Sequence, residues 1–189
     1  MKRYVIKIQY NSPVVLTFAL LALGALGLGI LTDGDTTMRY FSVYRAPLAD
    51  PLTWLRFFTH VLGHADYNHY IGNMLLILVV GPPLEEKYGS RSLLLAIVIT
   101  ALVSGLVQFM FFPGVALLGA SGIVFMMIVM SSLAGMKSRC IPLTLIFVVV
   151  FYLGGEIVAG LFSPDNVSQL THIVGGVCGA VIGYILYGK

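Results

Sequence analysis

Six apolar stretches divide the chain, and short polar or basic segments separate them. They cover about residues 13–31, 69–84, 92–112, 120–136, 141–162 and 170–187. A membrane-spanning helix needs roughly 20 apolar residues, and about 17 suffice. The first, third, fifth and sixth stretches reach this length, whereas the second and the fourth are short. Because irregular backbone is not tolerated against lipid, we expect the two short helices to be buried among their neighbours or to line a wet cavity.

The composition supports a protein that lies within a membrane. The 189 residues are 58% hydrophobic and only 10% charged, with a mean hydropathy of +0.94. A soluble domain of this length needs more charge to cover its surface, so we expect an all-α integral membrane protein. The net charge of +3 gives no indication of nucleic-acid binding. Two cysteines, Cys140 and Cys178, are too few for a disulfide framework and are interpreted as packing residues.

The basic residues gather at one set of helix ends. Eight of the eleven belong to that set: Lys2, Arg3, Lys7, Lys87, Arg91, Lys137, Arg139 and Lys189. Arg39, Arg45 and Arg56 belong to the other set. Basic residues favour the cytoplasmic side, so we expect both termini there, with the second, fourth and sixth helices beginning outside. The short termini without a transit segment predict a prokaryotic plasma membrane.

The first apolar stretch has features of both a signal peptide and a retained helix. Three basic residues precede it, as in a signal peptide. However, the stretch is long, and no small-x-small cleavage site follows it at Leu31–Gly34. These flanks favour a retained membrane helix.

The segment 32–68 is the one sizeable extramembrane piece, and it is rich in aromatic residues. Asp50 followed by Pro51 is typical of a helix cap and a first-turn proline. The apolar residues that follow have helical spacing: Trp54, Leu55, Phe58, Val61 and Leu62. We therefore expect a short helix lying in the outer membrane interface, where amphipathic aromatic side chains are favoured.

Four polar residues share one depth in the predicted topology. Ser121 opens the fourth helix, His172 lies near the start of the sixth, and His69 and Asn73 open the second. All three helices begin on the outer side. A serine and a histidine at one depth form the minimum pair for acyl transfer, since the imidazole can take the hydroxyl proton. The alternative for His172 is a buried histidine bonded to a backbone carbonyl, but Ser121 supplies a partner that favours a functional role.

The glycines and helix ends around these four polar residues indicate close helix packing and a place to bind an oxyanion. Small residues at every fourth position, Gly175, Gly179 and Gly183, allow close approach of the sixth helix, and Gly122 on the fourth is a plausible contact. Gly119 allows the turn into the helix of Ser121. The first-turn amides near Ser121 can bind an oxyanion. His69 and Asn73, spaced i and i+4, can donate to the same oxygen, or they can form an ordinary interhelical polar pair.

From Arg56 to the C-terminus, the chain resembles the rhomboid intramembrane serine proteases of the minimal six-helix bacterial type. The motifs that carry the resemblance are Gly119-Ala120-Ser121-Gly122, His69 with Asn73, Glu85 with Gly89, and His172 followed by Gly175 and Gly179. The resemblance implies a single membrane domain over residues 1–189 and a Ser121–His172 dyad without an acidic third member. It also implies an oxyanion hole built from the Ser121 amide beside Ala120, with His69 and Asn73.

The family resemblance further implies substrates that are transmembrane segments of other proteins, cleaved near their outer end, with no cofactor. Three positions depart from the common pattern. Phe125 stands where many members have tyrosine, Thr171 stands where many have alanine, and Trp54 is displaced by one position relative to Arg56. None of these departures removes a catalytic group, and Phe125 can still pack against His172.

Supporting roles are expected for several further polar residues. Ser104 and Gln108, with His60 in the loop above, are interpreted as a path that holds water for hydrolysis, although isolated helix–helix hydrogen bonds are an equal alternative. Arg56 and His64 are expected to fix the loop, and Glu85 is expected to tie the cytoplasmic end of the second helix to a neighbouring turn. Glu156, inside the fifth stretch, has two open interpretations: a water-filled entry route or a polar pair.

Three other functions compete with a protease. His60 and His64 have the i, i+4 spacing of zinc ligands, but no HExxH motif and no glutamate placed as a base accompany them, so no metal is expected. A non-proteolytic relative that binds transmembrane clients would have lost the serine or the histidine. A small transporter would carry its polar groups at the membrane midplane rather than at one side. The sequence makes no prediction of oligomeric state.

Overall fold

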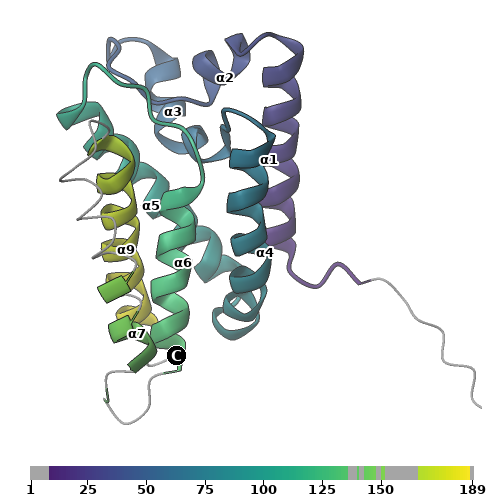
Figure 1. Cartoon of the computed structure of the whole chain (residues 1–189), viewed down its shortest axis with the longest axis vertical. Helices are drawn as coiled ribbons and strands as arrows, with labels where there is room; N and C mark the ends of the chain where they lie inside the picture. The colour runs from purple at the N-terminus through teal and green to yellow at the C-terminus, as the bar shows by residue number, and fades with distance from the viewer. Residues whose placement is uncertain (1–8, 136–139, 141–142, 148–149, 152–165, 188–189) are drawn as a thin grey trace, which may run out of the picture.

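The chain folds into a bundle of long helices with a group of short helices across one end (Figure 1). The computed structural model describes residues 9–135, 140, 143–147, 150–151 and 166–187. The long helices are α1 (Pro13–Leu31), α4 (Tyr67–Tyr88), α5 (Ser90–Phe111), α6 (Ser121–Ala134) and α9 (Asn166–Leu186). The end of the bundle where α4, α6 and α9 begin is called the loop end below. Among the described residues no strand is present, which confirms the predicted all-α class.

The helix bounds agree closely with the first, third and fourth apolar stretches, whereas α4 differs from the second and α9 begins four residues before the sixth. α1 has the predicted bounds, and α6, with 14 residues, is short as expected. The prediction of a short second helix was wrong, because α4 has 22 residues. It begins earlier than expected, at the Asp66 cap, and it continues through Pro82 and Pro83 to Tyr88. Within the part of the chain that the structure describes, three helical segments are long and apolar enough to cross a membrane: Pro13–Leu31, Ser90–Phe111 and Gln169–Leu186.

Most of the predicted fifth span, 141–162, lies outside the described residues, and so does Glu156. Within that span the structure describes α7 (Leu143–Phe147). The count of six spans therefore stays a prediction.

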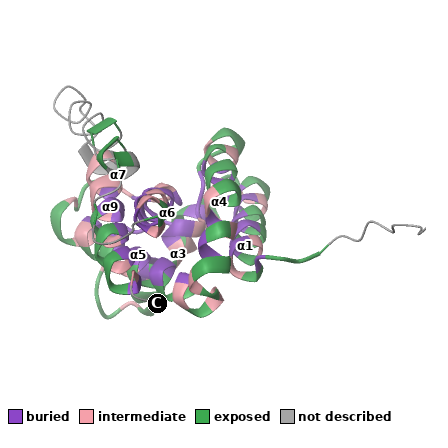
Figure 2. Ribbon diagram, turned by 90° about the horizontal axis from the view of Figure 1, so that it is seen from below, coloured by how far each residue is buried: buried purple, intermediate pink, exposed green. Residues whose placement is uncertain are grey.

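α6 occupies the centre of the bundle. Its buried residues lie on every side of the helix, including Ile123, Met126 and Met130, which are fully enclosed. A helix that is apolar all round is removed from water, either in a protein core or in a membrane, and protein encloses α6 here. Seen from below, α9, α5 and α4 lie next to α6, and α1 lies beyond α4 (Figure 2). This position explains how a helix too short for a bilayer is tolerated.

α6 and α9 form the most extensive helix contact among the described residues. A Cβ atom on Gly175 would collide with the carbonyl oxygen of Gly122, and one on Gly179 would collide with that of Met126. The backbones of the two helices therefore touch at these positions, which confirms the predicted close approach of the glycine line to Gly122.

The loop end is covered by α2 (Asp35–Tyr40), α3 (Pro51–Thr59) and the short 3-10 helix η1 (His60–Leu62). As predicted, the side chain of Asp50 accepts a hydrogen bond from the Leu52 amide at 2.9 Å, and Pro51 occupies the first turn. The single helix expected through Leu62 was wrong, because α3 ends at Thr59 and the chain tightens into η1. Trp54, Leu55 and Phe58 face outward, and Phe57 is buried.

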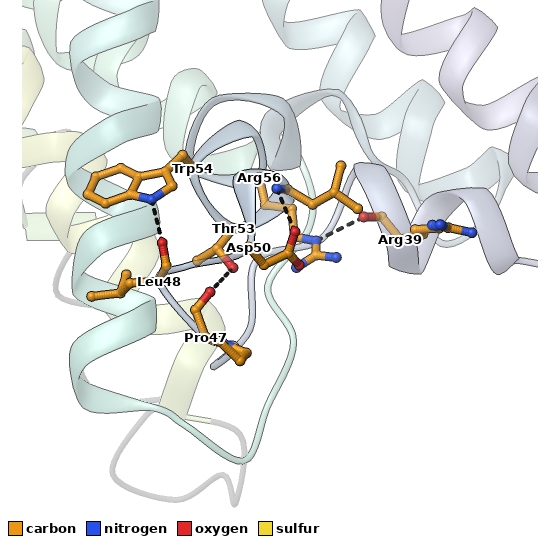
Figure 3. Close-up of polar contacts among 8 residues, drawn as sticks. Arg39, Pro47, Leu48, Asp50, Thr53, Trp54 and Arg56 are labelled. Carbon is orange, nitrogen blue, oxygen red and sulfur yellow. Dashed lines mark hydrogen bonds and ion pairs between the residues drawn. The ribbon is translucent and has the colours of Figure 1, made fainter.

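Arg56 holds this loop together, as expected. Its Nε donates to the Arg39 carbonyl at 2.8 Å, and its guanidinium lies 3.8 Å from the Asp50 carboxylate (Figure 3). The same guanidinium lies over the Tyr44 ring, 4.5 Å from its centre. Figure 3 also shows the indole of Trp54 donating to the Leu48 carbonyl, at 2.9 Å. The buried arginine thus joins α2, α3 and the segment between them.

Candidate functional site

A cavity of about 350 Å³ opens at the loop end between α4, α6 and α9. Ser121, His172, His69 and Asn73 all line it. These are the four residues that the topology argument placed at one depth, and the fold brings them together from three helices. The rest of the wall comes from α4 and α6: Asn68, Gly72, Leu76, Val124 and Phe125.

Ser121 is the first residue of α6 and follows a segment buried in the protein. Leu117 pairs with Val43 in an antiparallel bridge, and Ala120 is fully buried as the N-cap. The amides of a helical first turn have no intrahelical acceptor. The amides that begin at Ser121 therefore point out of the helix end beside the serine side chain. Residues 113–115 are exposed and Leu117, Gly119 and Ala120 are buried, so the chain descends into the protein before α6 begins.

Gly119 fits this descent in two ways. Its φ is +123°, in the region that favours glycine, and a Cβ atom there would lie 2.8 Å from the His69 ring. Its amide donates to the His60 carbonyl at 2.9 Å. Gly119 therefore makes the turn into α6 and lets the His69 imidazole lie against the backbone next to Ser121.

His69 and Asn73 lie one turn apart near the start of α4. The Asp66 carboxylate caps this helix by accepting the His69 amide at 2.8 Å. The side-chain amide of Asn73 donates to the His69 carbonyl at 3.0 Å. An asparagine amide carries two N–H groups, so one remains for another acceptor. The role of Asp66 as the cap of this helix was not predicted from the sequence, although an aspartate before an apolar helix is a known cap signal.

His172 lies on α9 with its ring stacked on that of Phe125. The ring centres are 4.4 Å apart and the planes differ by 11°. The expected packing of the phenyl ring against His172 is therefore present, without a phenol hydroxyl. Thr171 is buried, and its methyl group would lie 3.2 Å from a Cβ atom on Gly122. The contact between α6 and α9 thus fixes the position of His172 along the bundle axis relative to Ser121.

Comparison with known proteins gives a family for this arrangement. Residues 51–189 match the family model described as the rhomboid domain. This chain belongs to the rhomboid family. It is similar to rhomboid-related protein 1 of Caenorhabditis elegans, at 34% identity over 69% of this chain and 39% of the relative. It is also similar to rhomboid-related protein 2 of Mus musculus, at 30% identity over 74% and 53% of the two chains.

A bacterial relative extends the comparison. The rhomboid protease GlpG of Serratia proteamaculans is 27% identical over 80% of this chain and 55% of its own. The chain thus spans about half the length, or less, of these curated relatives. Family membership and the apolar helices together make this rhomboid an integral membrane protein.

The three residues predicted to hold water lie behind the cavity of this rhomboid rather than in its wall. His60 is buried, and its Nε2 lies 3.0 Å from the Ala101 carbonyl. Gln108 donates to the carbonyls of Val115, at 2.7 Å, and Phe112, at 3.3 Å. The Ser104 hydroxyl and His60 Nδ1 are buried and have no hydrogen-bond partner among the described residues. Burial lowers the pKa of His60 to about 4, so the imidazole is neutral at neutral pH.

His64 lies behind His69 in the rhomboid loop. Its Nδ1 lies 3.1 Å from the Leu62 carbonyl, and its ring centre lies 5.0 Å from that of His69 and 5.5 Å from that of Tyr70. The predicted role of His64 in fixing the loop therefore has a structural basis. The ring cluster itself was not predicted, because no local pattern relates residue 64 to the face of the next helix.

The sequence-based prediction did not include the other residues that line the cavity, although their spacing follows a helical pattern. Gly72 and Leu76 follow Asn68 at intervals of four residues, and His69 and Asn73 run beside them. That spacing describes one face of a helix. Extending the face from the two polar residues would have found the apolar part of the cavity.

Proposed function

We propose that this rhomboid is an intramembrane serine endopeptidase that uses Ser121 as nucleophile and His172 as base. The observation that supports the proposal is that three helices bring Ser121, His172, His69 and Asn73 to one cavity. The name of the Serratia relative, a rhomboid protease, agrees with this activity. A serine, a histidine and backbone amides at a helix start are the groups that acyl transfer requires.

The reaction begins with attack on a peptide carbonyl. The Ser121 hydroxyl gives its proton to the His172 imidazole, and its oxygen forms a bond to the carbonyl carbon. The oxygen of that carbonyl becomes an oxyanion. When the tetrahedral intermediate collapses, the C–N bond breaks and the imidazolium gives its proton to the leaving amine. An acyl ester on Ser121 remains. Water then attacks the ester, with His172 taking and returning a proton, and the serine is restored.

The oxyanion is stabilised from two helices in this proposal. The amides at the start of α6, beginning with Ser121 beside Ala120, point at the developing charge. The side chains of His69 and Asn73 donate from α4. Stacking on Phe125 holds the imidazole of His172 in place for both proton transfers. Loss of one such donor in other serine hydrolases costs about 10²–10³ in kcat.

We propose transmembrane protein segments as substrates. The cavity lies near one end of the bundle, and the outward-facing side chains of α4 beside it, Leu75 and Val79, are apolar and exposed. Cleavage would therefore occur near one end of the substrate helix. With eight of the eleven basic residues at the opposite set of helix ends, that end is the outer one. We place both termini in the cytoplasm and the protein in a prokaryotic plasma membrane.

Serine-directed labelling tests the proposal most directly. The purified protein is treated with a fluorophosphonate probe and, separately, with a reporter transmembrane segment. Wild type is expected to be labelled and to cut the reporter, whereas Ser121→Ala does neither. Ser131→Ala is the matched control, because Ser131 is an exposed serine near the other end of α6. Cleavage that survives Ser121→Ala, or an unlabelled wild type, would overturn the assignment.

The water path stays part of the proposal and has its own test. His60 and Ser104 carry buried polar atoms that no group in the described part of the chain satisfies, and a buried water can satisfy such atoms. Gln108→Leu is expected to lower kcat for the reporter with little change in KM, because the hydrolytic water loses its source. Fluorophosphonate labelling, which needs no water, should stay near the wild-type level. Unchanged turnover would contradict the water path and leave the nucleophile assignment intact.

A further inference from the structure

A groove of about 320 Å³ lies between the start of α1 and the start of α5, at the end of the bundle opposite the loop end. Buried Phe18 and Ile97 form its floor, and the half-exposed side chains of Leu21 and Leu94 form its two sides. The groove shares no residue with the cavity of Ser121. It is therefore a separate feature of the molecule, and the proposed cleavage does not use it.

The position of the groove places it against lipid. Its walls belong to α1 and α5, and each of these helices is long and apolar enough to cross a membrane. The lining follows the first turns of both helices for roughly 10–12 Å, at about 1.5 Å per residue. That length is about a third of the roughly 30 Å hydrocarbon core. The groove thus lies at one edge of the core, where lipid chains join their headgroups.

The groove offers little to a polar ligand. Its two hydroxyl groups already have protein partners: the Thr17 hydroxyl lies 2.9 Å from that of Tyr10, and the Ser90 hydroxyl donates to the Glu85 carboxylate at 2.7 Å. The other lining side chains are hydrocarbon. A polar ligand buried here would find few groups to replace its bonds to water, which is unfavourable. The lining therefore suits an alkyl chain.

The size of the lining side chains favours a lipid chain over a helix of another protein. Helix–helix contacts in membranes are enriched in glycine, alanine and other small residues, which let two backbones approach. The floor and sides of the groove are instead large side chains, and no glycine or alanine lines it. A helix with its side chains is also about 10–12 Å across, which is as wide as the groove is long.

Arg91 supplies a positive charge beside the groove. It follows Ser90 in the first turn of α5, is exposed, and has no ion pair or hydrogen bond with the described residues. The exposed strip that it begins continues through Leu94, Leu95 and Val98, at helical spacing. Residues three apart on a helix are neighbours, with Cβ atoms roughly 5–6 Å apart. Arg91 therefore adjoins the side of the groove that Leu94 forms.

The other charged groups at this end do not cancel that charge. Glu85 is buried and accepts three protein donors, and Lys87 donates to a carbonyl at the end of α6. Glu86 is exposed on α4, a helix that contributes no residue to the lining. Three more basic residues precede α1 in the sequence: Lys2, Arg3 and Lys7. The charge next to the groove is therefore positive.

We propose that this groove binds an acyl chain of an anionic phospholipid, whose phosphate is held by Arg91. The chain lies on Phe18 and Ile97 between α1 and α5, and the phosphate lies at the membrane edge. A guanidinium donates N–H bonds in a planar fork that matches phosphate oxygens. A zwitterionic lipid such as phosphatidylcholine has the same chains and phosphate, but its choline cation offsets the attraction. The site is therefore selective for an anionic headgroup.

Native mass spectrometry measures this selectivity directly. Full-length protein in an uncharged detergent is mixed with equal amounts of phosphatidylglycerol and phosphatidylcholine that carry identical acyl chains. Wild type is expected to retain one phosphatidylglycerol molecule in preference to phosphatidylcholine. Phosphatidylglycerol should also raise Tm more than phosphatidylcholine does, because a ligand that binds the folded state stabilises it.

Two adjacent leucines supply a variant and its control for the groove. Leu94→Trp fills the groove, whereas Leu95→Trp adds the same side chain on the exposed strip, outside the lining. Both side chains are about half exposed, so both variants are expected to fold, and circular dichroism checks this. Leu94→Trp is expected to lose the retained lipid, and Leu95→Trp is expected to keep it.

Two exposed arginines supply the variant and its control for the headgroup. Arg91→Gln is expected to lower the ratio of bound phosphatidylglycerol to bound phosphatidylcholine about fivefold, which is the effect of one basic residue near an anionic surface. Arg39→Gln removes the same charge from α2, at the loop end, and should keep the wild-type ratio.

Three results would overturn the proposal. Equal lipid retention by the two tryptophan variants would mean that the lipid binds elsewhere. Equal retention of both lipids by wild type would mean that the groove is filled by ordinary solvating lipid. A dimer in the same spectra that Leu94→Trp abolishes would make the groove a contact between two copies of the chain. Lipid binding needs no cleavage, so these results do not depend on whether Ser121 is a nucleophile.

Discussion

Gly119 connects backbone conformation to the proposed chemistry at a single residue. Its φ of +123° and the 2.8 Å separation between a hypothetical Cβ atom and the His69 ring leave no room for a side chain. Any substituent must push either the His69 imidazole or the first turn of α6. Both carry groups proposed to bind the oxyanion.

Gly119→Ala is therefore expected to lower kcat for reporter cleavage by more than about tenfold, because one oxyanion donor is displaced. The change should appear mainly in kcat, with a smaller change in KM. Gly114→Ala is the matched control, since a Cβ atom there meets nothing within 4 Å and the φ is not positive. Equal activity of the two variants would contradict the role of Gly119.

At the scale of helices, the start of α1, the end of α4 and the start of α5 meet at Glu85. Its carboxylate accepts the amides of Val14 and Val15, each at 3.0 Å, and the Ser90 hydroxyl at 2.7 Å. The N-cap of α1, Ser12, makes no side-chain cap bond. A residue of α4 therefore caps α1, and the same residue anchors the start of α5. The expected tie from Glu85 to a neighbouring turn is present and also reaches α1.

Glu85→Gln should lower thermal stability in detergent. One carboxylate oxygen becomes an NH₂ group, which cannot accept a backbone amide, and a buried donor left unsatisfied costs about 1–3 kcal/mol. Glu86→Gln is the control, because that neighbouring side chain is exposed. The two variants are compared by thermal unfolding followed by circular dichroism. Equal Tm values would argue against the cap.

The contact between α6 and α9 leads to a second prediction for helices. Gly175→Ala places a methyl group against the Gly122 backbone, so α9 must move away or the core must strain, at about 1–3 kcal/mol. Reporter cleavage should fall along with Tm, because the displacement also moves His172. Gly135→Ala is the control, since space is open there. A Tm equal to that of the wild type would mean that α6 and α9 can move apart with no loss of folding free energy, which would contradict the prediction.

These helices also indicate what local sequence can predict. The bounds of α1, the Asp50 cap and the start of α6 at Ser121 all follow from apolar periodicity and cap residues. α4 was underestimated because the apolar stretch stops at the charged Glu85, Glu86 and Lys87, whereas the helix continues to Tyr88. The bridge between Val43 and Leu117 and the ring contacts of His64 depend on distant segments. No local pattern encodes such contacts.

For the candidate site, the sequence predicted which residues meet but not how they are held. Ser121, His172, His69 and Asn73 were grouped by helix direction and depth alone. The Asp66 cap, the Gly119 contact with His69 and the engagement of Gln108 with two loop carbonyls needed coordinates. The dyad and the oxyanion hole remain predictions until Ser121→Ala is tested.

For the whole molecule, two buried neutral histidines predict loss of stability in acid. The pKa values of His60 and His64 are lowered to about 4 from an unfolded value of 6.5. Between pH 6.5 and 4 the unfolded chain binds protons that the folded chain does not, so the free energy of unfolding falls as the pH falls. His60, fully enclosed, contributes on the order of 3 kcal/mol of this loss. Stability from these groups is fully present above pH 6.5.

The measurement is Tm against pH for wild type and His60→Gln. The variant carries no titrating imidazole at this position, so its Tm should fall less steeply between pH 6.5 and 4. Carboxylates titrate equally in both proteins, and the difference between the curves isolates His60. Parallel curves would mean that the His60 imidazole has the same pKa in the folded and the unfolded chain.

The cap that Glu85 gives to α1 has a consequence for how the protein is made. The ribosome adds Val15 to the chain 70 residues before it adds Glu85, whose side chain accepts the Val15 amide. During that interval the first amides of α1 have only water or headgroups as partners. The carboxylate can reach them only once α4 lies beside α1 in the bilayer. The final position of the first helix is therefore set only when the second long helix is inserted beside it.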